Sequence, residues 1–164
     1  MSGKSPAKTN AARILDKSGI AYELIPYEFD ESDLSATHLA ETIGEDIHRV
    51  FKTIVLKGER KGHFVCVLPG DKEIDLKLAA KAIGDKKVDL IPMKDLLTLT
   101  GYIRGGCSPI GMKKSFPTFF HSTIENDDYV YVSAGQRGLQ FRLSPESLIK
   151  VTGGQITNLA KEEL

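Results

Sequence analysis

The hydrophobic positions of this chain fall into short segments of helical and strand-like spacing that alternate along the sequence. Ala11, Ile14 and Leu15 recur at helical spacing, and Gly19 follows them as a typical helix end. The pair Ser5-Pro6 predicts the start of this helix, because serine caps helices and proline favours their first position. Residues 1–4 are expected to be disordered. Further helices are expected at 35–44, 75–84 and 92–101 and from residue 144 onward.

Runs of β-branched and aromatic residues between these helices predict strands. They lie at 20–27, 49–57, 63–68, 88–91, 118–121, 129–133 and 139–143. Two polar turns that contain glycines, 58–62 and 134–138, join neighbouring strands as hairpins. Because strands and helices interleave and several strands form hairpins, we expect an α/β fold with a mixed sheet.

The composition is that of an ordinary globular chain. Its 164 residues suit a single domain spanning 1–164, with 41% hydrophobic and 27% charged residues. The formal net charge is zero, which argues against nucleic-acid binding through a broad positive field but leaves room for a focused basic patch. No apolar run is long enough to span a bilayer, and the N-terminus lacks the apolar core of a signal peptide. We therefore expect a cytoplasmic protein with no membrane partner. Its two cysteines are expected to be free thiols.

A lysine interrupts the apolar strand expected at 49–57. In Phe51-Lys52-Thr53 it stands where valine or isoleucine would be typical. A buried ammonium is costly unless it meets an anion or a cavity, which indicates a ligand site. The alternative is an edge strand from which the lysine head reaches water while its stem covers the core. The periodicity leaves both interpretations open.

The segment Gly105-Gly106-Cys107-Ser108-Pro109-Ile110-Gly111 holds three glycines and a proline in seven residues. This composition indicates an unusual backbone whose N–H groups can approach an anionic or oxygen-rich ligand closely. The alternative is a tight connection without a ligand. The sequence alone does not decide between them.

Motifs for metal, nucleotide and nucleophile chemistry are absent from the sequence. The four histidines form no H-x-x-x-H pair and the cysteines no C-x-x-C motif, so no metal site is expected. There is no P-loop and no G-x-S-x-G elbow, and no cofactor is expected. Cys107 is interpreted as a small loop residue, because the sequence places no base beside it. Tyr27 is either a core aromatic or a pocket wall.

Several of these segments, in this order and spacing, resemble the YbaK/EbsC family. The resemblance rests on Phe51-Lys52-Thr53, on Thr100-Gly101-Tyr102 leading into the glycine-rich loop, and on Tyr131-Val132-Ser133-Ala134-Gly135. It covers the chain from about residue 8 to the end and is closest to the bacterial Cys-tRNA(Pro) deacylases. These are free-standing relatives of the editing domain of bacterial prolyl-tRNA synthetases. The resemblance implies a mixed, barrel-like sheet surrounded by helices.

The resemblance also implies an activity and a site. The activity is removal, in trans, of cysteine mischarged onto proline tRNA, with prolyl-tRNA synthetase as a partner and the 3′ aminoacyl end as the substrate. The resemblance makes Lys52, Gly105 and Gly106 the catalytic positions. It places Tyr27, Thr53, Ser108, Pro109, Gly111, Ser133 and Gly135 at the substrate. Position 140 is glutamine, whereas some members carry an acidic residue near it, so no carboxylate role is expected there.

The chemistry of this family does not require a protein nucleophile. The substrate's own thiol attacks the ester carbonyl, and backbone N–H groups at Gly105 and Gly106 hold the oxyanion. Lys52 is expected to hold the terminal adenosine or its phosphate, or to steady the leaving ribose oxygen. Two alternatives stay open: a deacylase for Ala-tRNA(Pro) or another small aminoacyl-tRNA, and a non-catalytic module that binds tRNA ends or the synthetase. The sequence does not define the oligomeric state.

Overall fold

The computed structural model describes residues 8–162. The disorder expected at 1–4 and the helix start expected at Ser5-Pro6 lie outside these residues. Helix α1 runs Asn10–Lys17, and its N-cap is Thr9, whose hydroxyl accepts a hydrogen bond from the Ala12 N–H. The same hydroxyl donates to the carbonyl of Ala134 at 2.6 Å and so ties α1 to a strand.

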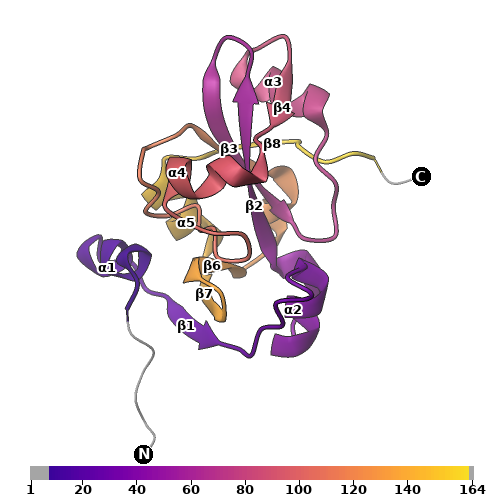
Figure 1. Ribbon diagram of the computed structural model, residues 1–164. Coiled ribbons are helices and arrows are strands. Elements are labelled where there is room, and N and C mark those ends of the chain that lie inside the picture. Colours follow the sequence, from indigo (N-terminus) through magenta and orange to yellow (C-terminus); the bar gives the residue numbers. More distant parts are fainter. Residues whose placement is uncertain (1–7, 163–164) are drawn as a thin grey trace, which may run out of the picture.

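Strands of the described chain form two sheets (Figure 1). One has three antiparallel strands in the order β1-β7-β6, and the other has five in the order β4-β2-β3-β5-β8. The larger sheet is mixed, because β4, β2 and β3 are antiparallel whereas β3, β5 and β8 are parallel. The strands are β1 (Glu23–Pro26), β2 (Phe51–Gly58), β3 (Gly62–Pro69), β4 (Val88–Leu90), β5 (Thr118–His121), β6 (Val130–Gln136), β7 (Leu139–Leu143) and β8 (Gln155–Thr157).

The helices begin at the polar residues that the sequence offers as caps. The side chains of Ser35, Asp75 and Ser144 accept hydrogen bonds from backbone N–H groups of α2, α3 and α5. Helices α2 and α3 end at glycines in the left-handed conformation. The bounds are α2 (Ala36–Ile43), α3 (Leu76–Ile83), α4 (Leu96–Thr100) and α5 (Pro145–Thr152), with 3-10 turns η1 (Ile47–Arg49), η2 (Met93–Asp95) and η3 (Ser122–Asn126).

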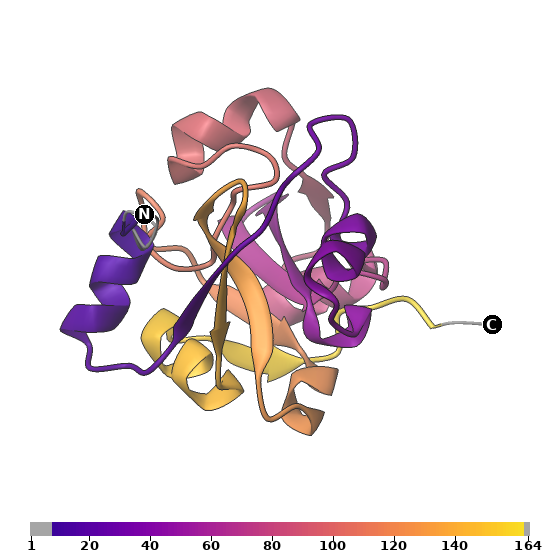
Figure 2. The same ribbon diagram turned by 90° about the horizontal axis from the view of Figure 1, so that it is seen from below.

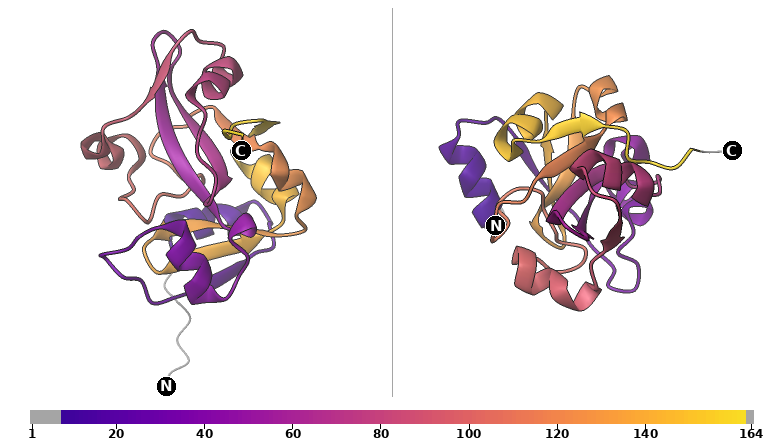
Figure 3. Two further views of the ribbon diagram at one scale, coloured as in Figure 1. Left: turned by 90° about the vertical axis from the view of Figure 1, so that its right-hand side faces the viewer. Right: turned by 90° about the horizontal axis from the view of Figure 1, so that it is seen from above.

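The main core lies between the two sheets. Phe51, Val55 and Phe120 of the larger sheet share one buried cluster with Val132 and Phe141 of the smaller sheet. Seen from below, β1, β6 and β7 cross the front of the molecule with α1 and α2 on opposite sides (Figure 2). The β2–β3 hairpin extends away from this smaller sheet (Figure 3). A second cluster fills the other face of the hairpin beneath α3.

The mixed α/β architecture expected from the sequence is confirmed. The strands form two sheets joined by one parallel bridge, Val50 to Tyr131, and the sheet is therefore not a closed barrel. Strand β8 was not predicted, because Gln155-Ile156-Thr157 is too short to show alternation and is defined by its pairing with β5. In the described chain, every helix is too short or too polar to cross a bilayer.

Candidate functional site

A small cavity opens where the two sheets meet, near the start of β2. Its volume is about 140 Å³. This is room for roughly four or five water molecules at ~30 Å³ each, and less than the ~300 Å³ of a small drug-binding pocket. The cavity therefore suits a group the size of a small side chain. Its lining comes from β2, the residues around α2, the glycine-rich loop and the hairpin β6–β7: Leu34, Ala36, Leu39, Val50, Phe51, Lys52, Thr53, Gly105, Cys107, Ser133 and Gln140.

Lys52 is partly buried and lies in the cavity wall. Its Nζ donates a hydrogen bond to the carbonyl of Gly70 at 3.3 Å. Burial lowers the pKa of the ammonium, while the carboxylates of Asp71 and Glu73 act in the opposite direction. The Gly70 carbonyl accepts a hydrogen bond from one of the three N–H groups of the Lys52 ammonium, and the other two are available to a ligand. This geometry favours the ligand-site interpretation over a side chain that merely reaches water.

Thr53 lines the same cavity and carries an unsatisfied hydroxyl. Its Oγ1 is buried, and it has no hydrogen-bond partner within the described chain. Buried hydroxyls without partners are unusual and cost about 1–3 kcal/mol. The Oγ1 therefore lies behind the cavity surface, and a hydrogen bond to a ligand requires a shift of the atoms that cover it.

The glycine-rich loop begins with a tight turn over residues 103–106. The N–H of Gly106 donates to the carbonyl of Ile103 at 2.9 Å, and Gly105 has φ +83° at the third position, as in a type II turn. The turn therefore uses the Gly106 N–H internally, which leaves it unavailable to an oxyanion. Among the bonds of the described residues, none involves the Gly105 N–H, and Gly105 itself lines the cavity.

Cys107, Ser133 and Gln140 complete the polar part of the wall. Burial raises the pKa of the Cys107 thiol to about 12, so the sulfur is protonated at neutral pH. The Ser133 Oγ accepts a hydrogen bond from the Gly135 N–H at 3.2 Å. Gln140 is only 3% exposed and offers a neutral amide to the cavity. The site thus has one cation and no carboxylate in its wall.

The structure brings together four of the predicted site residues: Lys52, Thr53, Gly105 and Ser133 line one cavity. Tyr27 lies in an adjoining hollow that shares Leu34, Leu39 and Gly105 with this cavity.

The other predicted residues do not line the cavity. Ser108 is fully buried, and its Oγ accepts from the Ile110 N–H inside the loop. Pro109 and Gly111 line a different hollow beneath α1. Gly106 and Gly135 are fitted against neighbouring atoms, since an added Cβ would lie 3.0 Å from Gln136 Cα and 3.1 Å from Tyr102 Cε1, respectively. These residues shape the loop and the bulged strand β6, and their contact with a substrate stays a prediction.

Sequence reasoning missed the apolar wall and the partner of the lysine. Leu34, Ala36 and Leu39 give no signal beyond the apolar face of a short helix. Gly70 supplies the carbonyl for Lys52, and a Cβ on it would lie 2.2 Å from the Cβ of Ala36. The pair Pro69-Gly70 at the end of a strand was the available clue, since it indicates a tight turn. Within residues 8–162 no group of three or more His, Cys, Asp or Glu side chains is placed to hold a metal ion.

The fold and the cavity can now be compared with known proteins. A sequence model described as the aminoacyl-tRNA editing domain matches residues 31–151, about three quarters of the chain. The chain belongs to this family. The matched range contains the four residues that line the cavity together, whereas Tyr27 precedes it.

Individual relatives agree with this assignment. The chain is 44% identical, over 98% of both chains, to EbsC of Enterococcus faecalis, whose name describes a candidate Cys-tRNA(Pro)/Cys-tRNA(Cys) deacylase. It is 28% identical to a proline–tRNA ligase of Fervidobacterium nodosum over 79 residues, which are 48% of this chain and 14% of the ligase. A crystal structure described as a candidate trans-editing enzyme for prolyl-tRNA synthetase has a TM-score of 0.82 and 23% identity, and the match covers 95% of this chain and all of the other. That structure shares the fold.

Proposed function

We propose that this protein removes cysteine from mischarged Cys-tRNA(Pro) by cleaving the aminoacyl ester. The observation that carries the proposal is the small cavity, whose wall contains Lys52, Thr53 and Gly105. Each of these residues has a donor that is not fully used within residues 8–162: the ammonium of Lys52, the hydroxyl of Thr53 and the N–H of Gly105. The space between them admits one small side chain. The name of the 44% identical relative supports the same substrate class.

The substrate's thiol acts as the nucleophile in this proposal. The cysteine sulfur attacks the carbonyl carbon, and the ester bond to the ribose oxygen breaks. The ribose oxygen takes up the proton that the thiol loses, so free tRNA and a cyclic thioester of cysteine leave the site. Water then opens the thioester to cysteine. Because nucleophile and carbonyl belong to one molecule, the contribution of the protein is to hold them in a reactive geometry.

Three donors have distinct tasks in this step. The Gly105 N–H is the donor best placed for the carbonyl oxygen as that oxygen gains negative charge, and losing such a donor typically costs about 3 kcal/mol. Lys52 binds the ribose or phosphate oxygens of the terminal adenosine, and its lowered pKa eases proton donation to the leaving oxygen. Thr53 completes the set by donating its unpaired hydroxyl hydrogen.

The protein's own thiol is poorly suited to act as the nucleophile. Cys107 lines the cavity, but burial holds the thiol protonated and the wall contains no carboxylate to accept its proton. The only histidine beside the adjoining hollow, within the described chain, is His38, which does not line the cavity itself. A reaction driven by the substrate's thiol needs neither group.

The size of the cavity and the chemistry of the substrate both select the amino acid that is removed. A pocket alone distinguishes one methylene by only about 1–3 kcal/mol, whereas a required thiol excludes alanine. A chain with zero net charge is a poor reader of tRNA identity by electrostatics alone. Prolyl-tRNA synthetase is therefore proposed as the partner that presents tRNA(Pro).

The experiment is a deacylation assay with purified protein and three substrates: Cys-tRNA(Pro), Ala-tRNA(Pro) and Cys-tRNA(Cys). We expect cysteine release that Lys52→Ala abolishes and that the exposed control Lys17→Ala leaves unchanged, with circular dichroism reporting the fold of both variants. Release of alanine would instead indicate a deacylase for small aminoacyl groups that does not need a substrate thiol. Tight tRNA binding without any release would favour a non-catalytic module.

A further inference from the structure

Two basic segments far apart in the sequence meet at the tip of the β2–β3 hairpin. One is the end of β2 and its turn, with Lys57, Arg60 and Lys61, and the other is the approach to β4, with Lys86 and Lys87. The carboxylate of Asp85 joins them, because it accepts hydrogen bonds from the N–H groups of Arg60 and Lys61 at 2.8 Å each and from Lys86 at 2.7 Å. The Glu59 N–H also donates to the carbonyl of Lys87 at 3.0 Å. We call these five cations the hairpin patch.

The hairpin patch is exposed and electrostatically unpaired. All five side chains are exposed, and within residues 8–162 none of them has a carboxylate within ion-pair distance. Elsewhere, Arg49, Arg142 and Lys161 each contact a carboxylate at 3.1 Å or less. The carboxylate of Asp85, the nearest acid, is occupied by backbone N–H groups, whereas Glu59 and Asp89 remain as exposed acidic neighbours.

A large hollow lies beside the hairpin patch. It has a volume of about 660 Å³ and is separate from the candidate catalytic cavity. Its wall holds the cations Lys57 and Lys87 and the imidazole of His63, together with three carboxylates, those of Glu59, Asp89 and Asp95. Burial lowers the pKa of His63, and the charges of Lys57 and Lys114 lower it further, whereas the carboxylate of Asp95 acts in the opposite direction. Because carboxylates outnumber lysines in this wall, phosphate contacts are expected at the hairpin patch and not inside the hollow.

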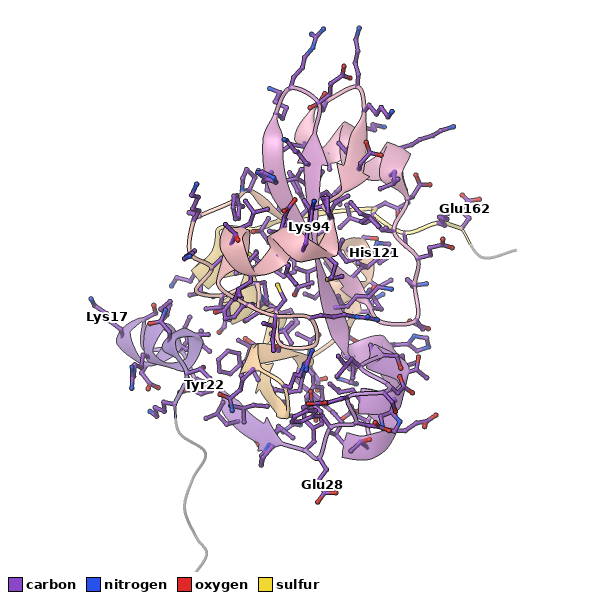
Figure 4. The ribbon with its side chains drawn as sticks, viewed as in Figure 1. Lys17, Tyr22, Glu28, Lys94, His121 and Glu162 are labelled. Atoms are coloured by element: carbon purple, nitrogen blue, oxygen red, sulfur yellow. The ribbon has the colours of Figure 1, made fainter. Side chains whose placement is uncertain are left out.

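The hairpin patch and the catalytic cavity lie along one strand. Thr53 and Lys57 are four residues apart on β2, so their side chains point to the same face of the sheet and lie roughly 13 Å apart along it. Between them the short helix α4 and the turn η2 cross this face, with exposed Lys94 at the front of the molecule (Figure 4). Val55, midway between Thr53 and Lys57, is buried in the main core, so the acceptor strand cannot follow β2 itself and would pass outside α4 and η2.

We propose that the hairpin patch binds the phosphate backbone of the tRNA acceptor arm while the 3′ ester occupies the cavity at Lys52. This inference rests on the proposed function and adds a surface that the cavity alone does not provide. Phosphate contacts position a nucleic acid without reading its sequence. The hairpin patch therefore contributes affinity for tRNA in general, and selection of cysteine stays with the cavity.

The test compares two triple variants with equal loss of charge. The patch variant is Arg60→Ala, Lys61→Ala and Lys87→Ala. The control variant removes three exposed lysines from other elements, Lys17→Ala, Lys77→Ala and Lys150→Ala. Binding of uncharged tRNA is measured by fluorescence anisotropy over a salt series. Deacylation is measured on full Cys-tRNA(Pro) and on a short cysteinylated oligonucleotide that ends in CCA.

The patch variant is expected to bind tRNA roughly tenfold more weakly at moderate salt. Its plot of log affinity against log salt is expected to be shallower by about two to three units, because three phosphate contacts are lost. KM for full tRNA should rise, with kcat and cleavage of the short oligonucleotide unchanged. Equal tRNA binding by the two triple variants would overturn the proposal, and so would a patch variant that loses affinity only for prolyl-tRNA synthetase. The binding measurement stands without catalysis, so it remains decisive if no ester is cleaved.

Discussion

Replacing Thr53 by valine is expected to stabilise the protein while weakening its activity. Valine has nearly the shape of threonine, so the change removes the buried Oγ1 without opening a cavity. Because that hydroxyl has no partner in the free protein, its removal relieves a desolvation cost of about 1–3 kcal/mol. We expect the free energy of unfolding to rise by about 1–2 kcal/mol. For a chain of this length this corresponds to an increase in Tm of roughly 3–6 °C.

The activity is expected to change in the opposite direction. If the hydroxyl donates to the bound aminoacyl end, its loss removes one neutral hydrogen bond and reduces kcat/KM about tenfold. Urea unfolding monitored by circular dichroism gives the stability, with an unchanged m value as a check on the two-state analysis. Deacylation of Cys-tRNA(Pro) gives the activity.

Thr123 provides a matched control for this prediction. Its Oγ1 is also buried without a partner, but it lies in η3 and lines none of the hollows beside the proposed site. Thr123→Val should therefore gain similar stability and keep full activity. The reasoning is refuted if Thr53→Val is no more stable than the wild type, or if both threonine variants deacylate equally well.

Three further outcomes are expected. Cys107→Ser should keep most of its deacylation rate, because the buried thiol is protonated; an inactive but folded variant would instead indicate a protein nucleophile. Gly105→Ala should lose more activity than the addition of one methyl group suggests. Alanine disfavours a φ of +83°, and its Cβ would lie 3.2 Å from a methyl carbon of Leu34. Kinetics like those of the wild type would exclude the turn from catalysis. Burial and the charge of Lys72 lower the pKa of His121, whose Nδ1 accepts a hydrogen bond from the Leu159 N–H. Because the unfolded chain therefore binds the proton first, the free energy of unfolding should decrease as the pH falls below about 6.5. The difference in this free energy between pH 7.5 and pH 5.5 should be smaller in His121→Asn than in the wild type.

Much of the fold follows from local sequence signals. The helix caps at Ser35, Asp75 and Ser144 and the glycine turns between strands can be predicted from the sequence, because they depend on interactions between residues close together in the chain. The split into two sheets is not local, because it depends on where β2 stops pairing with its neighbours. The bridge from Val50 to Tyr131 joins residues 81 positions apart, and the hydrophobic periodicity of the sequence does not predict it.

The candidate site, like the fold, was predictable from the sequence only in part. Lys52 stands out because a cation in an apolar strand needs an explanation, and the glycine loop stands out by composition. Ser108 and Ser133 look equally suitable as polar contacts, yet one caps its own loop and the other lines the cavity. Likewise the Gly106 N–H is bound within the turn, whereas that of Gly105 is free. Such differences depend on the direction of individual bonds, which the order of residues does not encode.

The contact between Gly70 and Ala36 makes two properties of the site inseparable. Ala36 is part of the wall of the cavity, and Gly70 holds the ammonium of Lys52 through its carbonyl. The two residues touch so closely that a methyl group on Gly70 would overlap Ala36. A larger side chain at position 36 therefore presses on the backbone that positions the lysine. Attempts to retune substrate choice at this wall will need to sample positions 36 and 70 as a pair, since either change alone also displaces the cation.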